Sequence, residues 1–268
     1  MTTRALTRST AVAALIVLLA GCSSQSPAPS STSPAASSSA PGQPTVVTGA
    51  GDITSALDRY RTTLGPDNGG DPVTHTTGRR EINWDAVPDA NATPNNLASD
   101  FFNATTAPRA RGAILKTDGG GVQVSANEGT GVLPRFGNIN PTYPSEFKTY
   151  SPQRLFSPVG SNAVDLTFTV PGTQTPAAVR GFGAVYTDID TEHTAFEYFD
   201  AAGKSLGKFA VPIADKGLSF LGVAFEQPIV ARVRIVYGQV ALGPNDSPAT
   251  DVAVMDDFIY GEPQAVKP

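Results

Sequence analysis

The sequence predicts an all-β fold: an antiparallel two-sheet sandwich of the jelly-roll type, with one short N-terminal helix. Three observations predict this class. The chain contains 26 Gly and 23 Pro among 268 residues, as expected for many turns. Apolar and polar residues alternate with a period of two, which is typical of half-buried strands. Segments of this kind recur at short intervals separated by turn residues, as in sandwiches and barrels.

Ten segments follow the strand pattern. In the clearest, 163–170, Val164, Leu166 and Phe168 share one face and Asp165 lies on the other. We expect strands at 80–85, 112–117, 121–126, 163–170, 179–187, 195–199, 206–211, 218–225, 229–237 and 252–260. The intervening stretches 86–110 and 127–162 are predicted loops.

A helix is expected at about 53–64, where apolar residues recur at spacings of three and four. Its apolar positions are Ile53, Leu57, Tyr60 and Leu64. Asp52 or Thr54 can cap its start, and Gly65 followed by Pro66 ends it.

The N-terminus has the pattern of an export signal. Arg4 and Arg8 precede an uncharged apolar run, Ala11 to Leu19, which is too short to span a bilayer. The run ends in Leu19-Ala-Gly-Cys22, which resembles the lipobox of bacterial lipoproteins. The resemblance implies that residues 1–21 are removed and that Cys22 is lipidated by a diacylglyceryl group. The alternative is an ordinary secretory signal followed by an unrelated cysteine.

The segment after Cys22 is predicted to be a tether. Residues 22–44 consist almost entirely of Ser, Pro and Ala, and such a segment cannot bury enough apolar surface to fold. We therefore expect a single domain at 45–268, exported and lipid-anchored on the outer face of the cell membrane. Two or more acyl chains, such as palmitate, anchor a protein stably.

Charge and cysteine content exclude several function classes. Removal of Arg4 and Arg8 leaves 17 basic against 24 acidic side chains, a net charge of −7, which disfavours nucleic acid as a partner. Cys22 is the only cysteine. Once it is lipidated, disulfides, thiol catalysis and zinc-thiolate sites are excluded.

Several short motifs resemble an uncharacterised family of secreted bacterial proteins, over about residues 53–263. They are Arg79-Arg-Glu-Ile-Asn-Trp-Asp85, Phe101-Phe-Asn103, Ser151-Pro-Gln-Arg-Leu-Phe156, Gly181-Phe-Gly183, Ser219-Phe-Leu-Gly-Val223 and Met255-Asp-Asp-Phe258. The opening strand that ends in Asp85 and the closing Asp-Asp-Phe strand also resemble jelly-roll domains of the carbohydrate-binding and galactose-binding-like type. That resemblance implies a β-sandwich and makes a glycan a candidate ligand.

The closing strand carries one carboxylate on each of two apolar faces. Strict alternation places Asp256 with Val254 and Phe258, and Asp257 with Met255 and Ile259. A buried, unpaired carboxylate is very costly.

Two alternatives follow for these carboxylates. Asp256 and Asp257 could hold a structural calcium ion together with Asp85, near Glu81, because calcium prefers carboxylate and carbonyl oxygens. Otherwise they pair with an arginine (Arg79, Arg80 or Arg154) or accept backbone N–H groups at a strand end. A second acidic string, Asp188-Ile-Asp190-Thr-Glu192, is interpreted as a solvated turn in preference to a calcium loop.

No residue pattern predicts catalysis. Glu81 and Asp85 could in principle act as a glycosidase acid and base. The two imidazoles, His75 and His193, lie in neither a hydrolase nor a metal-ligand motif.

Aromatic side chains on loops are the candidate sugar contacts. Tyr143 and Tyr150, in the Pro-rich stretch 134–158, are the tentative ligand-binding residues. Trp84 shares a strand face with Ile82, and we expect it in the core.

Together these patterns favour a non-enzymatic envelope binding module, with a glycan as a possible ligand. The alternative is a structural or protein-interaction lipoprotein of the envelope. A glycan-active hydrolase is the third candidate.

Overall fold

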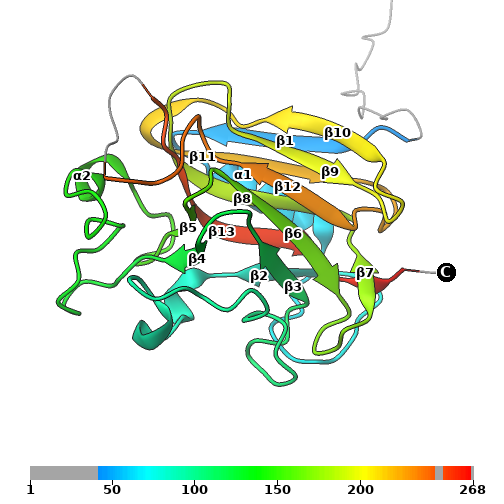
Figure 1. Cartoon of the computed structure of the whole chain (residues 1–268). Coiled ribbons are helices and arrows are strands. Elements are labelled where there is room, and N and C mark those ends of the chain that lie inside the picture. The colour runs from blue at the N-terminus through cyan, green and yellow to red at the C-terminus, as the bar shows by residue number, and fades with distance from the viewer. Residues whose placement is uncertain (1–41, 245–249, 267–268) are drawn as a thin grey trace, which may run out of the picture. The chain divides into compact units, whose positions relative to one another are not determined.

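The computed structural model describes residues 42–244 and 250–266, which form two antiparallel sheets packed together (Figure 1). The first sheet runs β1 (Thr45–Ala50), β11 (Ala214–Ala224), β8 (Gly181–Ile189), β13 (Val254–Gly261), β5 (Phe156–Val159) and β4 (Gly121–Val124), and β2 (Arg79–Ile82) also pairs with β13. The second sheet runs β10 (Ser205–Ala210), β9 (Ala195–Phe199), β12 (Arg232–Val236), β6 (Ala163–Thr169), β7 (Pro176–Ala178) and β14 (Gln264–Ala265), and β3 (Ala113–Lys116) also pairs with β6.

The strand order confirms a jelly roll. Eight strands in chain order, β5, β6, β8, β9, β10, β11, β12 and β13, make the orders β5-β13-β8-β11 and β6-β12-β9-β10. The first of the eight therefore pairs with the last, and the second pairs with the second-last. This nested antiparallel pairing is what two Greek keys in a double sheet produce.

All ten predicted strands are present, within a few residues at their ends. The predicted helix is α1 (Thr54–Leu64), and the Asp52 carboxylate accepts the N–H of Thr54 at its start. A second, four-residue helix is α2 (Tyr143–Glu146). Four strands were not predicted, namely β1, β5, β7 and β14. β5, β7 and β14 are short or contain a proline, and β1 (Thr-Val-Val-Thr-Gly-Ala) does not alternate apolar and polar residues, so a period of two is not visible in the sequence.

The space between the sheets is filled by aromatic side chains. Trp84 is fully buried, stacks on Phe156 at 4.4 Å between ring centroids and meets Phe258 edge-on at 4.9 Å. Its indole Nε1 donates to the backbone oxygen of Asp256, 2.9 Å away. Trp84 is thus a core residue, as predicted, although it lies in a 3-10 helix (Trp84–Ala86) that follows β2 and not on the strand itself.

Helix α1 covers the outer face of the first sheet. Tyr60 lies flat over Gly183 and Gly222, which are opposite each other in β8 and β11. A Cβ atom added to Gly222 would approach the Tyr60 ring to 2.6 Å. The glycines of the Gly181-Phe-Gly183 and Ser219-Phe-Leu-Gly-Val223 strings therefore make room for a helix.

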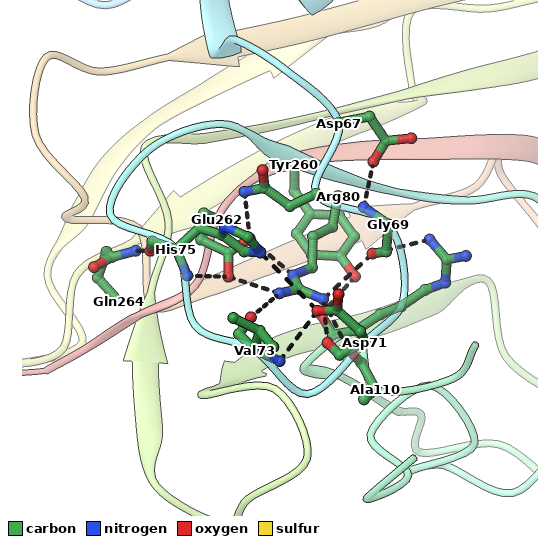
Figure 2. A network of polar contacts seen from close by, with 12 residues as sticks. Asp67, Gly69, Asp71, Val73, His75, Arg80, Ala110, Tyr260, Glu262 and Gln264 are labelled. Atoms are coloured by element: carbon green, nitrogen blue, oxygen red, sulfur yellow. Dashed lines mark hydrogen bonds and ion pairs between the residues drawn. The ribbon is translucent and has the colours of Figure 1, made fainter. Parts of the chain in front are cut away.

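A buried ion pair joins β2 and the end of β13, which are neighbours in the first sheet, to the loop between α1 and β2. Arg80 in β2 has no exposed side-chain surface, and its guanidinium makes two hydrogen bonds of 2.8 Å to Glu262, just after β13 (Figure 2). Its remaining N–H groups donate to the backbone oxygens of Asp71 and Val73 in the loop and of Ala110. One arginine therefore satisfies carbonyls from two loops and one carboxylate.

Glu262 completes this network from the other side. Its carboxylate also accepts the side-chain amide of Asn68 at 2.9 Å and the backbone N–H of His75 at 3.3 Å. The loop 66–78 is thus attached to β13 at several points, and both charges are fully paired.

Glu262→Gln is expected to destabilise the fold by about 3–5 kcal/mol, because it leaves the buried Arg80 guanidinium without a counter-charge. The free energy of unfolding in urea measures this. Asp165→Asn is the matched control, since Asp165 pairs with Arg232 and Arg234 on a half-exposed surface, where removal costs at most about 1 kcal/mol. Equal losses in the two variants would contradict the assignment of the buried pair.

Candidate functional site

A β-bulge interrupts the closing strand at its two aspartates. Met255 lies opposite Tyr186 and Phe258 lies opposite Ala184, so β13 has one residue more than β8 over this interval. The bulge resets the alternation of the side chains. Met255 therefore faces the space between the sheets together with Phe258, and the predicted sharing of a face by Met255 and Ile259 is wrong.

The bulge brings Asp256 and Asp257 to one serine. Ser151 Oγ lies 2.8 Å from Asp256 Oδ1 and 2.9 Å from Asp257 Oδ1. Because a serine hydroxyl has one proton to donate, both contacts are hydrogen bonds only when one of the two carboxyl groups is protonated and donates to Oγ. The N–H of Tyr150 also donates to Asp256 Oδ2 at 2.6 Å.

The surroundings of the pair favour that proton. Burial raises the pKa of Asp256 well above its usual range, and the neighbouring charge of Asp257 raises it further. Burial likewise raises the pKa of Asp257, with contributions from Glu81 and Asp85. The pair thus holds residues 150 and 151 through a shared proton.

Asp85 holds the same segment from its other side. Its Oδ1 accepts the backbone N–H groups of Gln153 at 3.0 Å and of Arg154 at 2.7 Å. All three carboxylates proposed for a calcium ion therefore lie along residues 150–154, where they accept hydrogen bonds from the chain. Within residues 42–244 and 250–266 they do not belong to a group of three carboxylates close enough to share one ion.

None of the three candidate arginines pairs with Asp256 or Asp257. Arg80 pairs with Glu262 and Arg79 with Glu81, and the guanidinium of Arg154 donates to Asp89. The alternative that named backbone N–H groups is correct for Asp256, whose partner is the amide of Tyr150.

Asp256→Asn is expected to stabilise the protein at pH 8 and to leave its stability nearly unchanged at pH 4. A carboxyl group with a raised pKa in the folded state contributes stability that is complete below its unfolded pKa, near 4, and is lost as the pH rises toward the folded value. The amide mimics the protonated form at every pH. A gain of about 1 kcal/mol would raise Tm by about 2–4 °C.

Thermal unfolding from pH 4 to pH 8 tests this, with Asp118→Asn, an exposed carboxylate, as the control. A lower Tm for Asp256→Asn than for the wild type at pH 8 would rule out the shared proton.

A different acidic group gathers where β8 ends. One carboxylate oxygen from each of Asp188, Asp190 and Asp215 lies within 4.8 Å of the others. Asp188 closes β8 with a positive φ of 65°, and Asp215 lies in a register shift of β11 between Ala214 and Leu218. The shift turns Asp215 toward the end of the neighbouring strand.

Burial and the neighbouring charges disfavour ionisation of Asp188. Burial raises the pKa of Asp188 to about 7, and the charges of Asp190, Glu146 and Asp215 add to the shift, although the N–H of Lys216 donates to Asp188 Oδ1 at 2.8 Å. A divalent cation would relieve this repulsion, and carboxylate oxygens are the ligands that calcium prefers. The three carboxylates could therefore hold a metal ion.

The acidic group opens into a pocket of about 480 Å³. Polar side chains line most of it, among them Asn140, Thr142, Glu146 and Lys216. Glu146 and Lys216 form an ion pair of 2.9 Å across its rim. The pocket lies between the loop 127–162, the end of β8 and the start of β11. It is open and lined mainly by polar groups.

Sequence reasoning found only part of this group. The string Asp188-Ile-Asp190 predicts a solvated turn, and no pattern in the sequence connects Asp215 with it. Asp215 is 25 residues from Asp190 in the sequence and reaches it only because Ala214 pairs with Ile189. The signal available was a charged pair, Asp215-Lys216, just before the expected strand 218–225.

The two candidate tyrosines are differently placed. Tyr143 is fully buried, stacks on Phe147 and donates its hydroxyl to the oxygen of Gly243, so the prediction of an exposed sugar-stacking ring is wrong for this residue. The stretch 134–158 was read as loop, but it contains α2, which packs Tyr143 inward. Tyr150 is half-buried, with its hydroxyl 3.5 Å from Arg61.

The residues considered for hydrolysis are held by other groups. Both oxygens of Glu81 accept from Arg61, and Arg79 also donates to it. Although burial raises the pKa of Glu81, these hydrogen bonds and charges lower it overall, which is unfavourable for a general acid.

Of the two histidines, His193 has a hydroxyl beside it, with its Nδ1 3.1 Å from Thr191 Oγ1. His193 is exposed, and the Thr191 hydroxyl beside it donates to Asp251. The Nε2 atom of His75 lies 4.0 Å from Oδ1 of Asp71.

The predicted lipidation site, Cys22, lies outside the described residues. Among residues 42–244 and 250–266, no helix combines the length and apolar character needed to cross a membrane.

Comparison with known proteins assigns no family. No protein-family model matches the chain, and no curated protein matches it. One solved structure, the enzymatically active domain of bacteriophage CBA120 tailspike protein 4, is similar at 16% identity with a TM-score of 0.27. The match covers 66% of this chain and only 22% of that one. A likeness this distant supports no inference about activity, and the two-sheet fold rests on the strand pairing described above.

Proposed function

We propose that this protein is a lipid-anchored binding module of the cell envelope, without turnover of its own, and that a divalent cation held by Asp188, Asp190 and Asp215 forms part of its binding site. The observation that carries the proposal is the convergence of these three carboxylates on an open, polar pocket of about 480 Å³. The pocket has the size of a site for a small ligand.

The chemistry of the cation suggests the class of ligand. Calcium takes six to eight oxygen ligands, more than three aspartates supply when each gives one or two. The remaining ligands of such an ion would have to come from the pocket, where hydroxyl groups of a bound molecule could supply them. A glycan offers such hydroxyls in neighbouring pairs, and Asn140 and Thr142 line the same pocket with further polar atoms.

The proposed location is supported by the pattern of the N-terminal residues. A basic n-region, an apolar run and the lipobox-like string ending at Cys22 support export and lipid attachment. The segment 22–44 would then hold the domain away from the membrane surface. The mature chain has a net negative charge, which favours an uncharged or cationic component of the envelope as the ligand of the anchored domain.

The hydrolase alternative has less support from the contacts. Glu81 is an ion-paired carboxylate with a lowered pKa, and Asp85 accepts two backbone N–H groups, so neither has the free carboxyl group that acid–base catalysis requires.

Asp215→Asn is expected to weaken calcium binding at least tenfold, because it removes one charged ligand of three. Isothermal titration of the wild-type chain with calcium should give a Kd in the range of about 10⁻⁴–10⁻³ M, as in extracellular modules. Asp118→Asn, which changes an exposed carboxylate elsewhere, is the matched control and should bind like the wild type.

A glycan array probed with and without a chelator then tests the ligand class. Signals that disappear with the chelator and in Asp215→Asn support the proposal. Glycan binding that persists in both, or equal calcium affinity in Asp215→Asn and the wild type, would contradict it.

A further inference from the structure

Strand β1 is an open edge of the first sheet. It pairs with β11 and with no other described strand, and Figure 1 shows it at the upper margin of the sheet. The N–H of Gly51 donates to Leu218 in β11. Because backbone groups alternate in direction along a strand, the N–H and C=O groups of Val46, Thr48 and Ala50 point the other way, toward the open side.

The sequence of this edge has no protective feature. From Thr45 to Gly51 there is no charged residue and no proline, and the register with β11 is continuous over all six residues of β1. Val46 is 45% exposed although it is apolar. Soluble proteins usually protect such an edge with lysine, proline, a bulge or a covering loop.

The other long edges carry such protection. In the second sheet β10 has a register shift between Ser205 and Gly207 and an exposed Lys208. In the first sheet β4 is covered by the segment 93–97, whose Leu97 N–H donates to the Val122 oxygen at 2.8 Å. The absence of these features at β1 is therefore specific to that edge.

We propose that β1 pairs with β1 of a second copy of this chain, antiparallel about a two-fold axis at Thr48. In this register Thr48 faces Thr48, Val46 faces Ala50, and the outward backbone groups of both strands form about six hydrogen bonds. A cross-strand threonine pair and an apolar pair are both favourable, and no like charges meet.

The surface beside the edge carries charges of both signs. A shallow groove of about 520 Å³ lies between the start of β1 and the exposed side of α1, with Asp58 and Arg59 at its rim. A two-fold axis perpendicular to the sheet places the two α1 helices on the same face. In this register the start of one β1 lies opposite Ala50 and Gly51 of the second copy, so the rim of each groove meets an uncharged part of the second strand and no like charges oppose the pairing.

Sedimentation velocity of the full-length chain in detergent, over a range of concentrations, tests the pairing. We expect the wild type to form a dimer and Thr48→Lys to be monomeric, because two ammonium groups would meet on the axis. Ala210→Lys, the same kind of change at an exposed position of β10, is the matched control and should remain dimeric.

A cysteine at the axis provides a second measurement that does not depend on detergent. Thr48→Cys should form an intermolecular disulfide in intact cells on mild oxidation, since the paired residues are directly opposite. Lys208→Cys, exposed on β10, should not. A monomeric wild type, a dimer that survives Thr48→Lys, or equal cross-linking of the two cysteine variants would overturn the proposal.

Discussion

The buried ion pair between Arg80 and Glu262 is the constraint on which the arrangement of the loops depends. A guanidinium without contact with water must have all of its donors satisfied, and here a carboxylate and carbonyls of the 66–78 loop and of Ala110 supply the acceptors. The pair lies where β2 and β13 meet. The Arg80 side chain therefore fixes the position of the loop after α1 relative to β2 and β13.

The same principle accounts for the other long loop. Asp85, Asp256 and Asp257 converge on residues 150–154, and each accepts hydrogen bonds from that segment. These buried polar groups attach irregular chain to a jelly roll. The Asp188 group differs, because it opens into a pocket and its carboxylates repel one another. This contrast is why we propose a binding role for the Asp188 group and a structural role for Asp256.

The strands with a clear period of two could be predicted, and so could α1. In these elements each side chain is apolar or polar according to whether its own position is buried. Trp84 in the core follows from the same pattern. Three features of the structure could not be predicted from this pattern. The bulge at Asp256 and Asp257 breaks the alternation without a sequence signal, since the residues on either side of the pair, Met255 and Phe258, are both apolar. Asp215 joins Asp188 only through the register of β11 with β8. Tyr143 lies in a proline-rich stretch that reads as loop, yet it packs inward on a short helix.

Amide hydrogen exchange of the Glu262→Gln variant tests the role of the buried pair most directly. The account predicts that amides of residues 66–78 lose protection by at least about tenfold relative to the wild type, while amides of β9 and β12, on the far sheet, exchange at nearly wild-type rates under conditions that favour the folded state. Unchanged protection of the loop, or a loss spread evenly over both sheets, would contradict the claim that this pair holds the loop in place.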